Sequence, residues 1–259
     1  MFPSTLPMDV PDSRPSMARP GRTLPARAAG HGFGRPAPAA GGRDSRPTTL
    51  SSLSPSLMQD LLRFDQDPPQ RQLLEVLAAC IRHTQPLAIS LAWELQSLAL
   101  TVFPLERLVH CPMPMVEFLA GDLAALQVLQ VRPAALRPPG STELARIGNP
   151  ALYTALDPLL WAVALRGSRN ALLPELSGQA AYRVAPGLTL RGLDLPGPLA
   201  ACVSRLRRQT SNLREIAGWQ QIGVARAIRL LNALYLQAGL IVSRTHPAAT
   251  NEGWTGYDT

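Results

Sequence analysis

A run of three helix-like segments near the C-terminal end of the chain constrains the fold more than any other feature. Apolar residues recur there at helical spacing, and a short strand-like stretch follows a glycine. In the third segment Val224, Ile228 and Leu231 share one face, while Arg226 and Arg229 lie on the polar side. The pattern predicts a helix-turn-helix core, with helices at about 197–208, 211–219 and 222–238 and a strand at 240–243.

The same region carries most of the net positive charge of the chain. Residues 199–246 contain seven arginines and one acid, Glu215, whereas residues 51–198 contain eleven arginines and twelve acids. If the module reads DNA, the start of the third helix enters the major groove and the other arginines contact phosphates. The chain has 25 arginines and no lysine, however, and this bias enlarges every basic patch.

The broad apolar surface of the third helix favours protein docking over DNA reading. Leu230, Leu234 and Ala238 lie off the face that the first two helices can cover, and only one strand follows, so a two-stranded wing is incomplete. We therefore expect a non-enzymatic regulatory or scaffold protein that binds a protein partner, and the alternative is a DNA-binding transcriptional regulator. The candidate interaction surface consists of Arg205, Arg208, Arg214, Gln221, Arg226, Arg229 and Leu234.

The two ends of the chain are expected to lie outside the folded part. Residues 1–50 are rich in Pro, Gly, Ala, Ser and Arg and have almost no large apolar residues. Such a segment cannot bury enough surface to offset the entropy cost of ordering, so we expect it to be disordered. Residues 248–259 are expected to be a C-terminal tail, turn-like from residue 251 onward. Both Met1 and Met58 are candidate translation starts.

Residues 51–132 are expected to form a small α/β unit. Ser54 followed by Pro55 is typical of a helix start, and residues 87–93 alternate between large and small side chains as a strand does. The expected elements are a helix from Pro55, a helix at 70–82, strands at 87–93, 98–102 and 105–110, a helix at 115–127 and an edge strand at 128–131.

A proline-rich stretch, residues 133–150, predicts a linker between this unit and a second domain at 151–247. The second domain is expected to contain a helix at 151–165, strand-like pieces at 180–184 and 188–191, and then the helix-turn-helix core. The predicted fold class is α+β: a small α/β unit followed by a mainly helical, winged-helix-like C-terminal domain.

The sequence contains no recognisable catalytic, cofactor or metal motif. Cys80 and His83 would share a helix face, but the adjacent pair His110 and Cys111 would point to opposite sides of an extended segment. A tetrahedral zinc site spaces its second pair of ligands by several residues, so we expect no structural metal. We also expect no cofactor and no enzymatic activity, because no nucleophile elbow or acid–base pair is visible.

The chain is expected to be a cytoplasmic protein without a membrane span. Residues 222–242 have the length of a span, but Arg226 and Arg229 lie inside this stretch, where charge is costly in a bilayer. Three scattered cysteines do not form a disulfide framework and are typical of a reducing compartment.

Residues 156–249 resemble the C-terminal part of a group of uncharacterised proteobacterial proteins. The stretches that carry the resemblance are 159–165, 172–175, 181–184 and 230–244. The final region is also similar to the degenerate winged helices that close some bacterial signalling and motility adaptors. The resemblance implies a regulatory role and assigns no residue a function.

Overall fold

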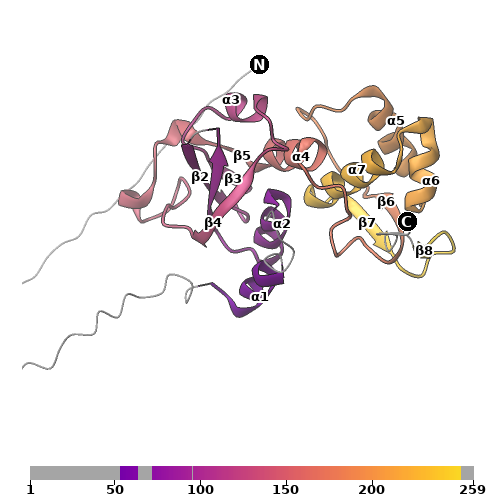
Figure 1. The fold of residues 1–259 in the computed structure, drawn as a ribbon, viewed down its shortest axis with the longest axis horizontal. Coiled ribbons are helices and arrows are strands. Elements are labelled where there is room, and N and C mark those ends of the chain that lie inside the picture. Colours follow the sequence, from indigo (N-terminus) through magenta and orange to yellow (C-terminus); the bar gives the residue numbers. More distant parts are fainter. Residues whose placement is uncertain (1–52, 64–71, 95, 252–259) are drawn as a thin grey trace, which may run out of the picture. The chain divides into compact units, whose positions relative to one another are not determined.

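The computed structural model describes residues 53–63, 72–94 and 96–251, all within the unit formed by residues 46–259 (Figure 1). The predicted disordered tail at 1–50 lies outside the described residues, as does the C-terminal segment from residue 252 onward.

Two short helices open the described part of the chain. The first, α1 (Pro55–Arg63), begins as expected, because the Ser54 hydroxyl accepts a hydrogen bond from the backbone N–H of Leu57 at 3.4 Å. The second, α2 (Leu73–His83), ends at Thr84, whose φ of 50° is left-handed. The first two residues predicted for this helix lie outside the described residues.

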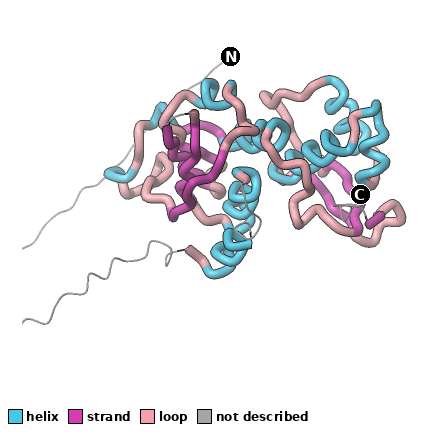
Figure 2. The backbone as a smooth tube through the Cα atoms, viewed as in Figure 1, coloured by secondary structure: helices cyan, strands magenta, loops and turns pink. Residues whose placement is uncertain are grey.

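A five-stranded antiparallel sheet follows, whose strands are magenta in Figure 2. Its strand order is β4-β1-β2-β3-β5. The strands predicted at 87–93 and 98–102 are confirmed, and they form an antiparallel hairpin in which Leu87 pairs with Val102 and Ile89 pairs with Leu100 on one buried face. The predicted edge strand is confirmed as well. The strands are β1 (Leu87–Trp93), β2 (Gln96–Phe103), β3 (Leu108–His110), β4 (Gln127–Pro133) and β5 (Tyr153–Ala155).

The helix predicted at 115–127 is shorter than expected. The observed α3 (Met115–Ala120) ends at Gly121, which is extended and lies against the Trp93 ring. A Cβ atom at Gly121 would collide with this ring, which stacks on Phe118 with the ring centroids 4.9 Å apart. Continuing the helix would displace these aromatic contacts, so the chain turns and enters β4 instead.

The helix predicted at 151–165 also begins later than expected. The chain first forms the 3₁₀ turns η2 (Leu144–Arg146) and η3 (Pro150–Leu152) and then strand β5, which pairs with β3. The helix α4 (Leu156–Arg166) begins only there, with the backbone N–H of Leu156 donating to the carbonyl of Arg107 at 2.9 Å. The sheet therefore takes strands from both sides of the predicted linker at 133–150.

The apolar helix α4 connects the sheet to the C-terminal helices. It contacts α2 and also packs along α7 (Val224–Leu236), and Leu159, Leu160 and Trp161 are buried in these contacts. Within the described residues the buried side chains on both sides of α4 belong to one continuous hydrophobic cluster. This explains the apolar run that the sequence shows at 159–165.

The three helices predicted near the C-terminus are present, with different ends. They are α5 (Gly197–Leu206), α6 (Leu213–Gly218) and α7, and the 3₁₀ turn η4 (Trp219–Gln221) joins the last two. The cap of α6 is Asn212, whose Oδ1 accepts from the N–H of Glu215 at 2.8 Å. Ser211, where the predicted helix begins, instead forms two backbone hydrogen bonds with Tyr182 in β6 (Gln179–Val184).

The C-terminal sheet differs from the predicted wing. Its order is β7-β6-β8, formed by β6, β7 (Leu240–Ser243) and β8 (Thr250–Asn251), so a second strand follows α7. Both β7 and β8 pair with β6 and not with each other. The strand predicted at 188–191 has no strand partner and is an irregular loop. The described chain is thus a mixed α/β fold with antiparallel sheets.

Candidate binding groove

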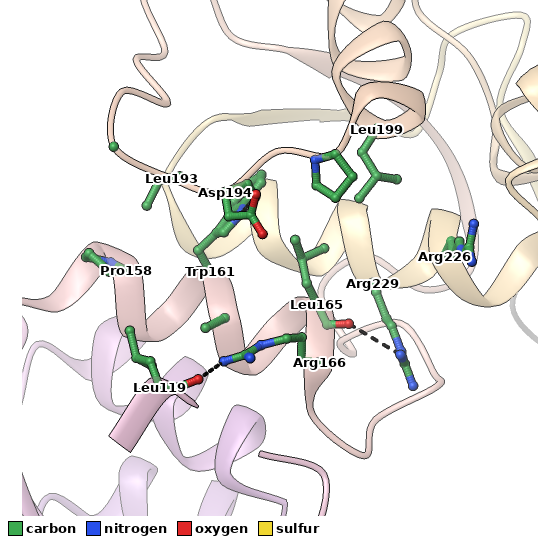
Figure 3. A pocket seen from close by; sticks show the side chains of 13 residues that line it. Leu119, Pro158, Trp161, Leu165, Arg166, Leu193, Asp194, Leu199, Arg226 and Arg229 are labelled. Carbon is green, nitrogen blue, oxygen red and sulfur yellow. Dashed lines mark hydrogen bonds between the residues drawn. The ribbon is translucent and has the colours of Figure 1, made fainter. Parts of the chain in front are cut away.

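A groove of about 480 Å³ lies between α4, the loop before α5, and the first turns of α5 and α7 (Figure 3). We call it the α4 groove. Its lining residues are Leu119, Pro158, Trp161, Ala162, Leu165, Arg166, Gly192, Leu193, Asp194, Pro196, Leu199, Arg226 and Arg229.

Helix α4 supplies the floor of this groove. Pro158, Trp161, Ala162 and Leu165 follow one another at spacings of three, one and three residues, which places them on one side of a helix. Trp161 is 2% exposed, and its indole N–H donates to the carbonyl of Asp194 at 2.6 Å. This bond fixes the loop at 192–196 against α4 and forms one wall.

Three arginines reach the groove from two helices (Figure 3). Arg166, at the end of α4, donates to the carbonyl of Leu119. Arg229, on α7, donates to the carbonyl of Leu165 at 3.3 Å and to the side-chain oxygen of Asn170 at 2.9 Å. Arg226 is exposed in the first turn of α7. Arg166 and Arg229 are therefore held by neutral oxygen acceptors rather than by a carboxylate.

The side chains that line the groove carry a net positive charge. Its only lining carboxylate is that of Asp194, and none of the three arginines forms an ion pair in the described part of the chain. Some arginines elsewhere pair with acids, as Arg169 does with Glu75, and others bond backbone carbonyls, as Arg244 does. The helices α5 and α7 add to this field, because both place their positive N-terminal ends at the groove.

The candidate surface expected from the sequence is only partly assembled here. Arg226 and Arg229 line the groove, whereas Arg205, Arg208, Arg214 and Gln221 do not. The Arg205 guanidinium lies over the Trp219 ring at 4.3 Å from the ring centroid. The other three are exposed side chains near α5, α6 and η4.

The placement of Leu234 on an interaction surface is wrong. Its side chain is 0% exposed, because α4 packs along α7 and covers the apolar stripe that the first two helices leave open. Eight of the thirteen residues of α7 are buried, and only its first turn, from Val224 to Arg226, is exposed. This helix is a core element for most of its length.

The candidate surface predicted from the sequence does not include Trp161, Arg166 or Asp194, which line the groove. The apolar run of α4 has the pattern of a buried helix on every side, so no local signal separates its groove side from its core side. The one local indication of an exposed side was Arg166, which directly follows the apolar run.

Of the cysteines and histidines that the sequence singles out, Cys80, His110 and Cys111 are buried, and the His83 ring lies within hydrogen-bonding distance of Ser56 and Asp60. The thiol of Cys80 donates to the carbonyl of Gln85 at 3.2 Å, and burial raises its pKa to about 12. Burial also raises the pKa of Cys111 and lowers the pKa of His110. No group of three His, Cys, Asp or Glu side chains in the described ranges lies close enough to hold a metal ion.

No helix among the described residues combines the length and the apolar character that a membrane crossing requires. A scan of protein-family models and searches of curated proteins and of solved structures returned no match to this chain. The α4 groove is therefore interpreted from its own geometry and chemistry.

Proposed function

We propose that this protein is a non-enzymatic regulatory or scaffold protein, and that it binds a segment of a partner protein in the α4 groove. The observation that carries the proposal is the lining of the groove: an apolar floor beside arginines that have no carboxylate partner in the described chain. Apolar grooves with a few placed polar groups are typical of recognition sites.

The chemistry of the lining supports binding rather than catalysis. The groove residues include no hydroxyl, thiol or imidazole, and Asp194 is their single carboxylate. A general acid–base pair or an activated nucleophile needs at least two such groups within hydrogen-bonding reach. A cytoplasmic location is part of the proposal, and it is supported by three cysteines that are buried free thiols.

DNA binding by the helix-turn-helix remains the alternative. Its support is the group of exposed arginines that includes Arg205, Arg208 and Arg226. Three observations count against it. Most of α7 is buried, Arg229 is held by Leu165 and Asn170, and the two strands that follow the helix do not form a hairpin wing. A recognition helix instead exposes a side along the major groove.

The proposal is tested by crosslinking in cells of the native host. A photoreactive amino acid at Leu193, in the groove wall, should capture a partner protein that the same amino acid at exposed Leu129 on β4 does not capture. The partner is then purified, and Ala162→Tyr, which fills the floor, should abolish its binding. If position 193 captures nothing beyond the position 129 control, the docking proposal is wrong.

The alternative is tested in parallel with the full-length protein. It is titrated with genomic DNA fragments at about 0.15 M salt, where exposed charges are screened as in the cell. We expect only sequence-independent binding that weakens as salt is raised. Enrichment of one discrete DNA sequence, lost in the Arg208→Ala/Arg226→Ala variant, would support the DNA-binding regulator.

A further inference from the structure

We infer that the segment that occupies the α4 groove is an acidic, apolar stretch of a partner protein, with its carboxylates toward Arg226 and its apolar side chains against Leu119, Pro158 and Leu193. This inference rests on the proposed function and adds the chemistry of the bound segment. Neither the sequence pattern nor the comparisons assign a ligand to this groove.

The apolar half of the recognition comes from two helices and one loop. Leu119 of α3, Pro158 of α4 and Leu193 of the loop lie together at one end of the groove, where Figure 3 shows them around the Trp161 side chain. Water at such a surface is displaced favourably by large apolar side chains of a partner. A purely polar or purely charged segment gains nothing from this end.

The charged half comes from the arginines, two of which lie at the other end. Arg226 and Arg229 lie away from Pro158 in Figure 3, whereas the guanidinium of Arg166 points toward Leu119. No carboxylate of the described chain pairs with any of the three, and only Asp194 opposes them within the lining. Carboxylates are the protein groups that guanidinium binds best, which specifies an acidic occupant.

The N-terminal ends of two helices are a second, independent indication that the occupant is negatively charged. The helices α5 and α7, of ten and thirteen residues, both place first-turn residues in the groove. Neither has a side-chain cap at its N-terminus, and neither has an acid in its first turn. By contrast, α2, α4 and α6 carry Glu75, Asp157 and Glu215 there. The uncapped positive ends favour a negative group supplied by the partner.

The test is an unbiased selection of binders. A random peptide display library is panned against the full-length protein, and the enriched peptides are sequenced. We expect acidic residues together with large apolar residues. Because the chain is basic overall, each peptide must also crosslink to a photoreactive group at Leu193 and not at Leu129.

Charge reversal then tests complementarity in solution. The affinity of the best peptide is measured by fluorescence anisotropy and should fall about tenfold or more with Arg166→Glu/Arg226→Glu. It should be unchanged with Arg208→Glu, an exposed arginine outside the groove. The same peptide with lysines in place of its acids should bind the charge-reversed protein better than the wild type. If the double variant does not fold, the exposed single variant Arg226→Glu replaces it.

Several outcomes overturn the inference. They are no enrichment, enrichment of neutral or basic peptides, unchanged affinity for the charge-reversed protein, or crosslinking at position 129. The proposed function is judged separately: if a native partner crosslinks at position 193 through a segment without acids, docking stands and the acidic chemistry is wrong. If no native partner crosslinks there, the proposed function itself is wrong.

Discussion

Asn232 is the polar residue whose replacement should cost the most stability. Its side chain is 0% exposed in the middle of α7. Its Oδ1 accepts from the N–H of Leu173 at 2.9 Å, and its Nδ2 donates to the carbonyl of Ala171 at 3.0 Å. These bonds fix the loop after α4 onto the core, and this loop also contains Asn170, which positions Arg229 of the groove.

The magnitude follows from what Asn232→Ala leaves behind. Leu173 is 0% exposed, so its N–H becomes a buried donor without a partner, which costs about 1–3 kcal/mol. Ala171 is exposed, so water can replace the lost bond to its carbonyl. The vacated side-chain volume adds a cavity penalty, which brings the total to roughly 2–4 kcal/mol. For a domain of this size the melting temperature should fall by roughly 5–15 °C.

The assay is urea unfolding followed by tryptophan fluorescence and circular dichroism, with Asn149→Ala as the matched control. Asn149 is exposed, and its Oδ1 accepts one hydrogen bond, from the N–H of Ala151. Loss of this exposed hydrogen bond should lower the free energy of unfolding by less than about 1 kcal/mol. Asn232→Asp keeps the acceptor but buries a charge, so it should be less destabilised at pH 5 than at pH 8, because burial favours the neutral acid. An Asn232→Ala variant within about 0.5 kcal/mol of the wild type, the range of surface substitutions, would refute the reasoning.

Three further predictions concern α1, α2 and the α3 turn. Burial alone would raise the pKa of Asp60, but hydrogen bonds and charge from His83 and Arg82 lower it overall. The carboxylate therefore stabilises the folded state at pH values above its pKa in the unfolded chain. This stabilisation is lost as the pH falls through the lower pKa of the folded state. In urea titrations Asp60→Asn should be less stable than the wild type at pH 7, with a gap that narrows below about pH 4; a gap that is independent of pH would contradict this. Gly121→Ala should cost about 1–3 kcal/mol in thermal unfolding because it displaces the aromatic stack, and an unchanged melting temperature would show that the ring moves freely. With the other two cysteines replaced by alanine, Cys80 should not react with a thiol reagent at pH 8 until urea is added, and a fast reaction in the native protein would contradict its burial.

The sequence by itself determined the elements whose signals are local. The cap at Ser54, the alternation from Leu87 to Trp93 and the helical spacing in the last third of the chain each act within a few residues, and the structure has the corresponding helices and strands. Hydrogen bonds at helix ends and the period of side-chain burial are fixed by backbone geometry, so they can be predicted without knowledge of the fold.

Tertiary structure decided what depends on contacts between distant segments. The end of α3 is set by Trp93, the start of α4 by pairing of β5 with β3, and the last sheet by β6 binding β7 and β8. Likewise, Leu234 is core because α4 covers α7, and the groove exists because Leu119, Asp194 and Arg226 meet on α4. An apolar residue or an arginine has the same local signal whether the chain covers it or leaves it open to a partner, so only the packing distinguishes core from binding site.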